Sequence, residues 1–350
     1  MKGILHNHSE NSRYDSTMDV KVLCKRAKEC GYEAVALTDH GTLTGIDDFI
    51  AAAAECDIKP IPGVEAYVQE DNSMYKRFHL ILLAVDDLGY QGIGKAVSDS
   101  NTRIDSKGFP RMNKEILEYY FAEGKKYHGH VIATSACAGG VLAGLALSPL
   151  EFDKEILKLK KRQENYEVPE SETYKKNVDN LNAINITLET LKEDRERLTK
   201  LSKRPFKKKE KDVEKKKGTE LYEEALAELN HEKEETEQAK IQLEEIKAKI
   251  AATTRNITSL RGRIKDSLED QQKYIAIQTQ IDEIESKKLD IDDLYDLVKK
   301  EALYYNRLFG EDNFFIEIQY HGFKNENDVP IEKAVFPVLA DIAKKTGIKL

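Results

Sequence analysis

Residues 3–8 read Gly-Ile-Leu-His-Asn-His, a short apolar run that ends in two histidines. On an extended chain, residues two apart point to the same face, so His6 and His8 can both face one ion. A second apolar run, residues 34–37, ends in Thr-Asp-His-Gly and places His40 at the carboxyl end of another predicted strand. Histidines gathered at the ends of separate strands predict a metal site.

Four more residues of metal-binding type lie in similar settings. Glu65 stands within the strand-like run 63–68, where an unpaired acid would be costly. Asp15 lies in a polar loop, His79 opens an apolar run and Cys137 follows one. Imidazole, carboxylate and thiolate together suit zinc, manganese or iron. The candidate metal ligands are therefore His6, His8, Asp15, His40, Glu65, His79 and Cys137.

Each candidate also has an ordinary structural alternative. A single histidine at a strand end usually makes only a hydrogen bond, and a lone cysteine usually packs in a core. The joint occurrence of all seven favours the metal site. His128 and His130 precede a predicted strand and are expected in an exposed loop, while His231 is expected on the surface of a charged helix.

The order of these residues resembles the PHP (polymerase and histidinol phosphatase) domain, a metal-dependent phosphoesterase fold. Two further segments, residues 109–115 and 314–322, resemble the amino-terminal PHP domain of bacterial DNA polymerase III alpha subunits. The resemblance covers residues 1–150 and 296–350. Its motifs are His6-Asn7-His8, Ser12-Arg13-Tyr14-Asp15, Thr38-Asp39-His40-Gly41, Gly63-Val64-Glu65, His79-Leu80 and Ser135-Ala136-Cys137.

The resemblance implies an α/β fold, a distorted (βα)7 barrel with ligands at the carboxyl ends of parallel strands. Alternating strand-like and helix-like runs also favour βα units. The family's last strand carries an Asp-x-His pair, and the chain stops before it, so we expect a truncated final strand and a fragment of a longer reading frame. Ser16 also stands where alpha subunits usually have Gly.

The same resemblance assigns up to three divalent ions. One would use His6, His8, Glu65 and the absent Asp. A second would use Glu65, His79 and Cys137, and a third Asp15, His40 and the absent His. Glu65 would bridge two ions that activate a water for attack on a phosphate ester. Arg111 either contacts the phosphate or forms a structural ion pair, and His321 either orients a ligand or is structural.

A long charged segment interrupts the domain. Residues 151–293 contain only two glycines and are rich in Glu, Lys, Leu, Ile and Gln, which is typical of long helices. A heptad seam formed by Leu243, Ile246, Ile250, Thr253, Ile257, Leu260 and Ile264 predicts a coiled coil. We expect an antiparallel hairpin with arms at 153–201 and 220–289, and a second-arm break near 252–256 remains open. The predicted domains are 1–150, this insertion and 294–350.

The tip of the hairpin is strongly basic. Residues 203–217 hold nine basic and three acidic residues. One interpretation is a solvated spacer or self-association arm, another is contact with nucleic-acid phosphates, and a third is docking to another replication protein. The candidate nucleic-acid contacts are Lys207, Lys208, Lys209, Lys215, Lys216 and Lys217.

Composition bounds the remaining interpretation. The chain has 350 residues, 34% of them charged, and a net charge of −8, which argues against a general nucleic-acid coat. No secretory signal, membrane span or disulfide framework is visible, so we expect a cytoplasmic protein. Three functions stay open: the amino-terminal part of a replicative DNA polymerase, a stand-alone phosphoesterase acting on a small ester or an oligonucleotide, and an inactive metal-stabilised scaffold.

Overall fold

The computed structural model describes residues 2–12, 15–69, 77–105, 107–320, 322, 324 and 331–350. The chain divides into two compact units. Unit 1 contains Met1–Lys154 and Lys287–Leu350, and unit 2 contains Glu155–Ser286. Among the described residues, no helix is both long and apolar enough to cross a membrane.

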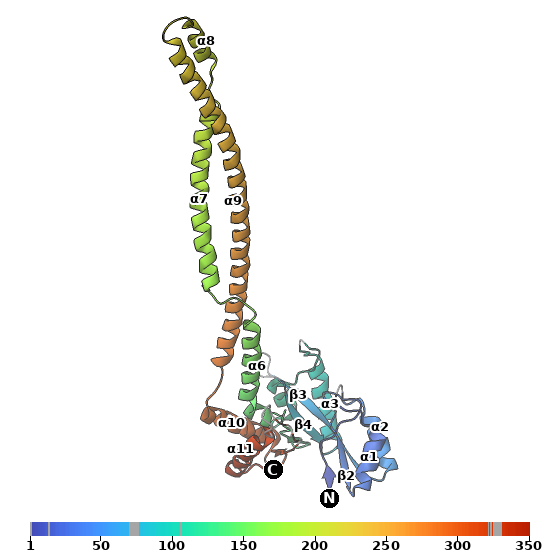
Figure 1. Ribbon diagram of the computed structural model, residues 1–350. Coiled ribbons are helices and arrows are strands. Elements are labelled where there is room, and N and C mark those ends of the chain that lie inside the picture. Colours follow the sequence, from blue (N-terminus) through green and yellow to red (C-terminus); the bar gives the residue numbers. More distant parts are fainter. Residues whose placement is uncertain are drawn as a thin grey trace. The chain divides into compact units, whose positions relative to one another are not determined.

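Unit 1 is built on a curled, half-barrel sheet whose strand order is β1-β2-β3-β4-β5-β6 (Figure 1). Residue Lys349 continues the sheet through a parallel bridge to Phe315. The strands are β1 (Gly3–Ile4), β2 (Ala34–Leu37), β3 (Lys59–Val68), β4 (Phe78–Ala84), β5 (Val131–Thr134) and β6 (Phe314–Phe315). This arrangement confirms a mixed α/β fold.

The expectation of parallel strands throughout is wrong at β4. Strands β1, β2 and β3 are mutually parallel, and so are β5 and β6, but β4 pairs antiparallel with both β3 and β5. The reason lies in the length of the connection. A parallel return needs a crossover of a dozen or more residues, whereas fewer than that separate Val68 from Phe78.

Helices cover the sheet and close two apolar cores. Helices α1 and α2 pack on β2 through Leu23, Phe49 and Leu37, all buried. The larger core joins β3, β4 and β5 to the remaining helices of unit 1. The helices of unit 1 are α1 (Val20–Glu29), α2 (Ile46–Glu55), α3 (Asp87–Asn101), α4 (Lys114–Phe121), α5 (Ala143–Ala146), α10 (Ile291–Phe309) and α11 (Ile331–Thr346).

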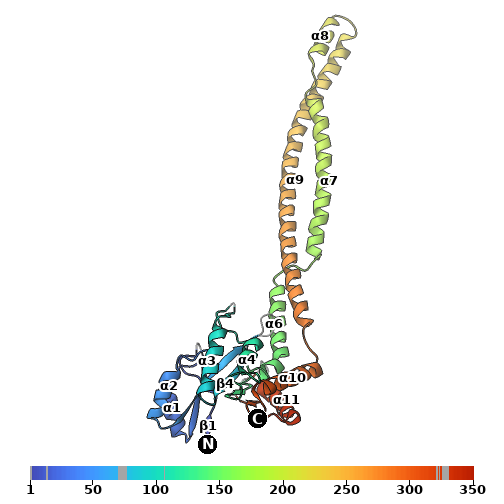
Figure 2. The same ribbon diagram turned by 180° about the vertical axis from the view of Figure 1, so that it is seen from behind.

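Unit 2 is a helical hairpin. Its helices are α7 (Glu172–Ser202), α8 (Lys207–Lys215), α9 (Tyr222–Glu285) and the later part of α6 (Ser148–Gln163). Leu198 of α7 packs against Leu243 of α9. The side-chain amide of Gln163, at the end of α6, donates a hydrogen bond to Oε1 of Gln278 in α9. Residues later in the first arm, formed by α6 and α7, therefore contact residues earlier in α9, so the two arms run antiparallel. Helices α7 and α9 lie side by side in both views (Figures 1 and 2).

The buried side of α9 follows the predicted seam. Leu243, Ile257 and Leu260 are buried, and the four other seam residues are half-buried. Helix α9 is continuous for 64 residues, so it passes through residues 252–256 without a break. The first arm does break, because α6 ends at Gln163 and α7 begins at Glu172. Pro169 lies in this gap and disfavours helix in the residue before it.

Candidate metal centre

The strand ends bring the candidate ligands together. His6 and His8 follow β1, and His40 follows β2. His40 then forms a parallel bridge with Glu65 in β3. In the antiparallel pair of β3 and β4, His79 lies opposite Tyr67, two residues from Glu65 on the same face. Sheet pairing therefore places His40, Glu65 and His79 at one site, and the chain beyond β1 brings His6 and His8 to it.

Glu65 lies at the middle of the cluster and is 1% exposed. Its Oε2 atom lies 2.8 Å from Nε2 of His8 and 3.2 Å from Nε2 of His6. The same oxygen is 3.3 Å from Nδ1 of His40. The other oxygen, Oε1, is 2.9 Å from Nδ1 of His79. One buried carboxylate thus contacts four imidazoles.

Asp15 extends the cluster toward solvent. Its Oδ2 atom lies 3.4 Å from Nε2 of His40 and 3.8 Å from Nε2 of His8. Each of three groups has ligand atoms that all lie within 4.8 Å of one another, a spacing that could hold an ion. The groups are His6 with His8 and Glu65, His8 with Asp15 and His40, and His40 with Glu65 and His79.

The electrostatics of the cluster depend on these contacts. Burial alone would raise the pKa of Glu65, but the close contacts with the imidazoles of His6, His79 and His8 hold that pKa well below its usual range. Burial would lower the pKa of His6, yet hydrogen bonds to Glu317 and Glu65 outweigh it and raise the pKa to about 10. Burial lowers the pKa of His40 to about 4. At pH 7 Glu65 is therefore ionised and His40 is neutral, as metal ligands must be, whereas metal-free His6 is protonated and would release its Nε2 proton when an ion binds.

Three buried polar atoms at the centre of the cluster show whether a metal would fit there. Oε1 of Glu65, Nδ1 of His40 and Nδ1 of His79 have no hydrogen-bond partner among the described residues. The Glu65 and His79 atoms are close, at 2.9 Å, yet they lie outside hydrogen-bond geometry. Buried polar atoms normally have partners, so these three leave a need that a cation would satisfy. The donor set fits a divalent transition metal.

Three polar residues that we did not predict support the ligands. Glu317, just beyond β6, accepts a hydrogen bond from Nδ1 of His6 at 2.8 Å. Ser12 lies 2.9 Å from Nδ1 of His8 and donates its own proton to Asp39. Asp39 is 2% exposed. One signal in the sequence could have revealed Glu317: like Glu65, it is an acid within an apolar run.

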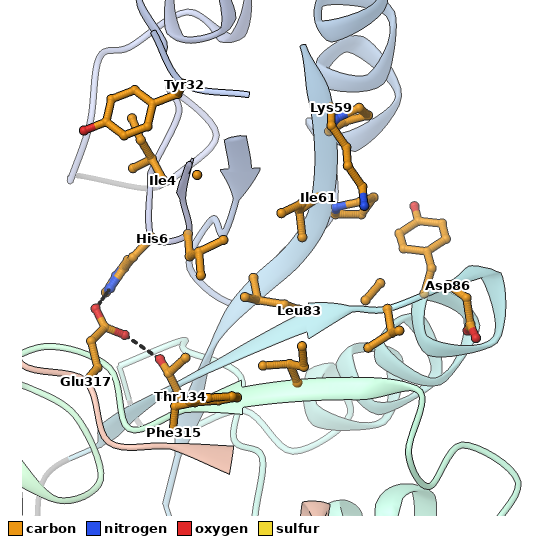
Figure 3. Close-up of a pocket in the computed structure, with 18 of the residues that line it drawn as sticks. Ile4, His6, Tyr32, Lys59, Ile61, Leu83, Asp86, Thr134, Phe315 and Glu317 are labelled. Atoms are coloured by element: carbon orange, nitrogen blue, oxygen red, sulfur yellow. Dashed lines mark hydrogen bonds and ion pairs between the residues drawn. The ribbon is translucent and has the colours of Figure 1, made fainter. Parts of the chain in front are cut away.

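A cavity of about 1050 Å³ adjoins the centre inside the half-barrel. His6, Thr134 and Glu317 line one end, as Figure 3 shows, and Lys59 and Asp86 lie away from them. Most of the wall between is apolar and comes from strands on both sides. Of the candidate metal ligands, His6 lines this cavity, so the cavity reaches the edge of the metal centre.

Cys137 stands apart from the three groups found among the described residues. It is half-buried in the turn after β5, and burial raises the pKa of its thiol to about 11. The turn itself is fixed to the site, because the backbone N–H of His79 donates to the carbonyl of Gly139 at 2.9 Å. The ligand set of Glu65, His79 and Cys137 therefore stays a prediction for its third member.

The side chain of Arg111 belongs to none of the three ligand groups. Nε of Arg111 donates to the carbonyl of Arg103 at 3.4 Å, so this side chain contacts its own loop, and a phosphate contact stays a prediction. His321 lies outside the described residues, as do Arg13 and Tyr14 of the quoted motif. The basic tip belongs to unit 2, where helix α8 has no buried residue.

Comparisons with known proteins match the first part of the chain to one family. Residues 5–167 match the PHP domain family. The DNA polymerase III subunit alpha of Borreliella burgdorferi is 38% identical over 170 residues, which are 45% of this chain and 14% of that protein. The subunit of the same name from Campylobacter jejuni is 39% identical over 144 residues, 39% of this chain and 11% of that protein.

One solved structure, an amidohydrolase from Chromobacterium violaceum, is 25% identical and covers 29% of this chain and 34% of its own, with a TM-score of 0.25. A TM-score this low supports no inference about the fold or the function. The sequence match identifies a PHP domain at residues 5–167. Within the PHP class the chain is similar to DNA polymerase III alpha subunits, although it spans only 11 to 14% of the relatives reported above.

Proposed function

We propose that unit 1 is a metal-dependent phosphoesterase module of a DNA polymerase III alpha subunit in the bacterial cytoplasm. The observation that carries this proposal is the buried Glu65 carboxylate among four imidazoles, with three buried atoms that lack partners. Relatives named as DNA polymerase III alpha subunits support the assignment to replication. The proposed role is hydrolysis of phosphodiesters at DNA 3′ ends, or structural support of the polymerase.

The residues present define what the centre would do. His6, His8 and Glu65 would hold one ion, His8, Asp15 and His40 a second, and His40, Glu65 and His79 a third. Bound divalent ions would activate water and neutralise charge on a phosphate. Asp15, half-exposed at 50%, is the ligand that a substrate reaches first. Glu65 is buried and ionised, so its carboxylate would be available as a ligand to the ions.

The test uses the full chain loaded with Zn²⁺ or Mn²⁺. We expect release of mononucleotides from the 3′ end of DNA, and a loss of at least about 100-fold when both His6 and His8 become alanine, since several catalytic effects depend on the ions. The matched control replaces His128 and His130, which have the same spacing and belong to no ligand group. Equal activity in both double variants would contradict the proposal.

Two alternatives give different results in the same experiment. A stand-alone phosphoesterase would hydrolyse a small ester such as p-nitrophenyl phosphate better than DNA. An inactive scaffold would bind metal and hydrolyse neither, and its melting temperature would fall when the metal is removed. The alpha-subunit similarity favours DNA as the substrate.

A second candidate function concerns the basic tip in unit 2, which we propose to contact nucleic-acid phosphates. Three of its six candidate lysines are engaged: Lys209 pairs with Glu232, Lys215 with Asp212 and Lys217 with Glu214. The other three, Lys207, Lys208 and Lys216, are exposed and form no ion pair with any described residue. These three are therefore the available charges.

The tip proposal is tested by the salt dependence of DNA binding. Changing Lys207, Lys208 and Lys216 to Gln should reduce the slope of log K against log salt by about 2 to 3, because each neutralised phosphate contributes about 0.9. The same change at the engaged Lys209, Lys215 and Lys217 is the matched control and should reduce it less. Equal slopes in both triple variants and the unchanged protein would rule out phosphate contact at the tip. A spacer or a protein-docking arm would then remain.

A further inference from the structure

Glu317 is held in place from two sides. One carboxylate oxygen, Oε1, lies 2.8 Å from Nδ1 of His6. The other accepts a hydrogen bond from the hydroxyl of Thr134 (Figure 3). The backbone N–H of Glu317 donates to Oγ of Ser135 at 2.9 Å. The side chain therefore has one orientation fixed by β5, the neighbouring strand.

This orientation decides which nitrogen of His6 carries a proton. A carboxylate can only accept, so Nδ1 of His6 must be the donor. In a neutral imidazole the lone pair then lies on Nε2, which is 3.2 Å from Oε2 of Glu65 and 3.3 Å from Nε2 of His8. The lone pair of His6 thus faces the first ligand group.

His8 is oriented the same way by a different partner. Ser12 gives its hydroxyl proton to Asp39, so its oxygen must accept from Nδ1 of His8. The Nε2 atoms of both histidines are left free to bind one ion. The partner of His6 is a carboxylate and that of His8 is a hydroxyl, so only Glu317 adds negative charge behind a ligand. Such a carboxylate raises the basicity of the ligating imidazole.

We propose that Glu317 is a positioning residue of the metal centre, which fixes His6 as the Nδ1–H tautomer and presents Nε2 to the ion shared with His8 and Glu65. This proposal rests on the proposed function only in requiring that the centre binds metal. Glu317 and His6 are 311 residues apart. The segment after the insertion therefore contributes directly to a site whose three ligand groups, as found among the described residues, precede the insertion.

The experiment measures Zn²⁺ affinity of the full chain by competition with a chromophoric chelator. Glu317→Gln should bind Zn²⁺ about 10- to 100-fold more weakly, the usual effect of losing such a partner. Glu311→Gln, an exposed acid of the same unit, should bind like the unchanged protein. Thr134→Val, which removes only the second anchor of Glu317, should weaken binding by a smaller factor and serves if Glu317→Gln fails to fold.

A second readout separates positioning from simple packing. Long-range ¹H–¹⁵N spectra of the zinc-loaded chain should show His6 protonated at Nδ1, and Glu317→Gln should lose that uniform signal. An affinity within twofold of the unchanged protein, or His6 protonated at Nε2, would overturn the proposal while leaving the metal centre intact. If the unchanged chain bound no Zn²⁺, the proposed metal centre itself would fall. Zinc binding without hydrolysis would remove only the phosphoesterase activity.

Discussion

Asp39 shows how much of the site depends on a residue that touches no predicted ion. Its carboxylate accepts hydrogen bonds from the backbone N–H of Ser9 at 2.6 Å, from the hydroxyl of Ser9 at 2.6 Å and from Ser12 at 2.9 Å. No basic side chain among the described residues forms an ion pair with it, so these donors compensate its burial. The loop carrying His8 is thereby tied to the strand end carrying His40.

A single substitution tests this role. Asp39→Asn should lower the free energy of unfolding by about 2 to 3 kcal/mol. The substitution replaces a charged acceptor by an amide, whose two N–H donors would need acceptors at a position surrounded by donors. Chemical denaturation of the metal-free chain measures the change. Asp296→Asn, at an exposed position of α10, is the control and should change the stability by less than about 0.5 kcal/mol. Equal effects at both positions would contradict the role given to Asp39.

At the residue scale, the candidate ligands could be predicted because each has a local signal. His6, His8, His40, Glu65 and His79 end, flank or lie within apolar runs, Asp15 lies in a polar loop, and the structure brings all six together. The supporting residues carry weaker signals. Glu317 meets His6 only because β6 pairs beside β5, and nothing near Glu317 in the sequence indicates that pairing. Cys137 has a signal like the others, but its thiol belongs to none of the groups.

At the scale of elements, strands and helices follow local patterns while their directions depend on the connections. The predicted run 34–37 agrees with β2, and the predicted run 63–68 lies within β3. Strand β4 was placed correctly along the chain, yet its antiparallel pairing was missed because βα alternation was applied to a connection too short for a helix. Similarly, Pro169 divides the first arm that composition alone predicts as continuous.

The buried face of α9 allows a matched test within one helix. Ile281 of α9 is 1% exposed and packs with Ile156 and Leu159, whereas Ile275 of the same helix is 51% exposed. Ile281→Ala should cost about 2 to 4 kcal/mol of unfolding free energy. Ile275→Ala should change it by less than about 0.5 kcal/mol. Thermal and urea unfolding followed by circular dichroism measure both, and similar losses would mean that α9 buries a different face.

At the scale of the whole molecule, unit 2 is inserted between two neighbouring positions of unit 1. Nζ of Lys288 and Oδ1 of Asp153 form an ion pair at 2.6 Å, so the chain returns close to where it leaves. Because the two ends of the insertion lie close together, unit 1 can accommodate it without a change in the sheet. Charge and helix periodicity predict the insertion from sequence, but the precise exit and return points depend on this contact.

Excision of the insertion tests the independence of unit 1. Replacing residues 155–286 by a short Gly/Ser linker should leave the number of bound Zn²⁺ ions unchanged, because every residue of the three ligand groups lies in unit 1. Circular dichroism and metal analysis of the purified protein provide the readout. An unfolded product, or one that no longer retains zinc, would show that unit 2 is required for the fold of unit 1.

The central claim is that Glu65 is shared by two of the three ligand groups, whereas Asp15 belongs to one. Its most direct test is the zinc content of the full chain after loading and desalting, measured by inductively coupled plasma mass spectrometry. The unchanged chain should retain more than one ion, Asp15→Asn should lose one at most, and Glu65→Gln should lose more than Asp15→Asn. A chain that retains no zinc, or a Glu65→Gln variant that retains as much as the unchanged protein, would contradict the claim.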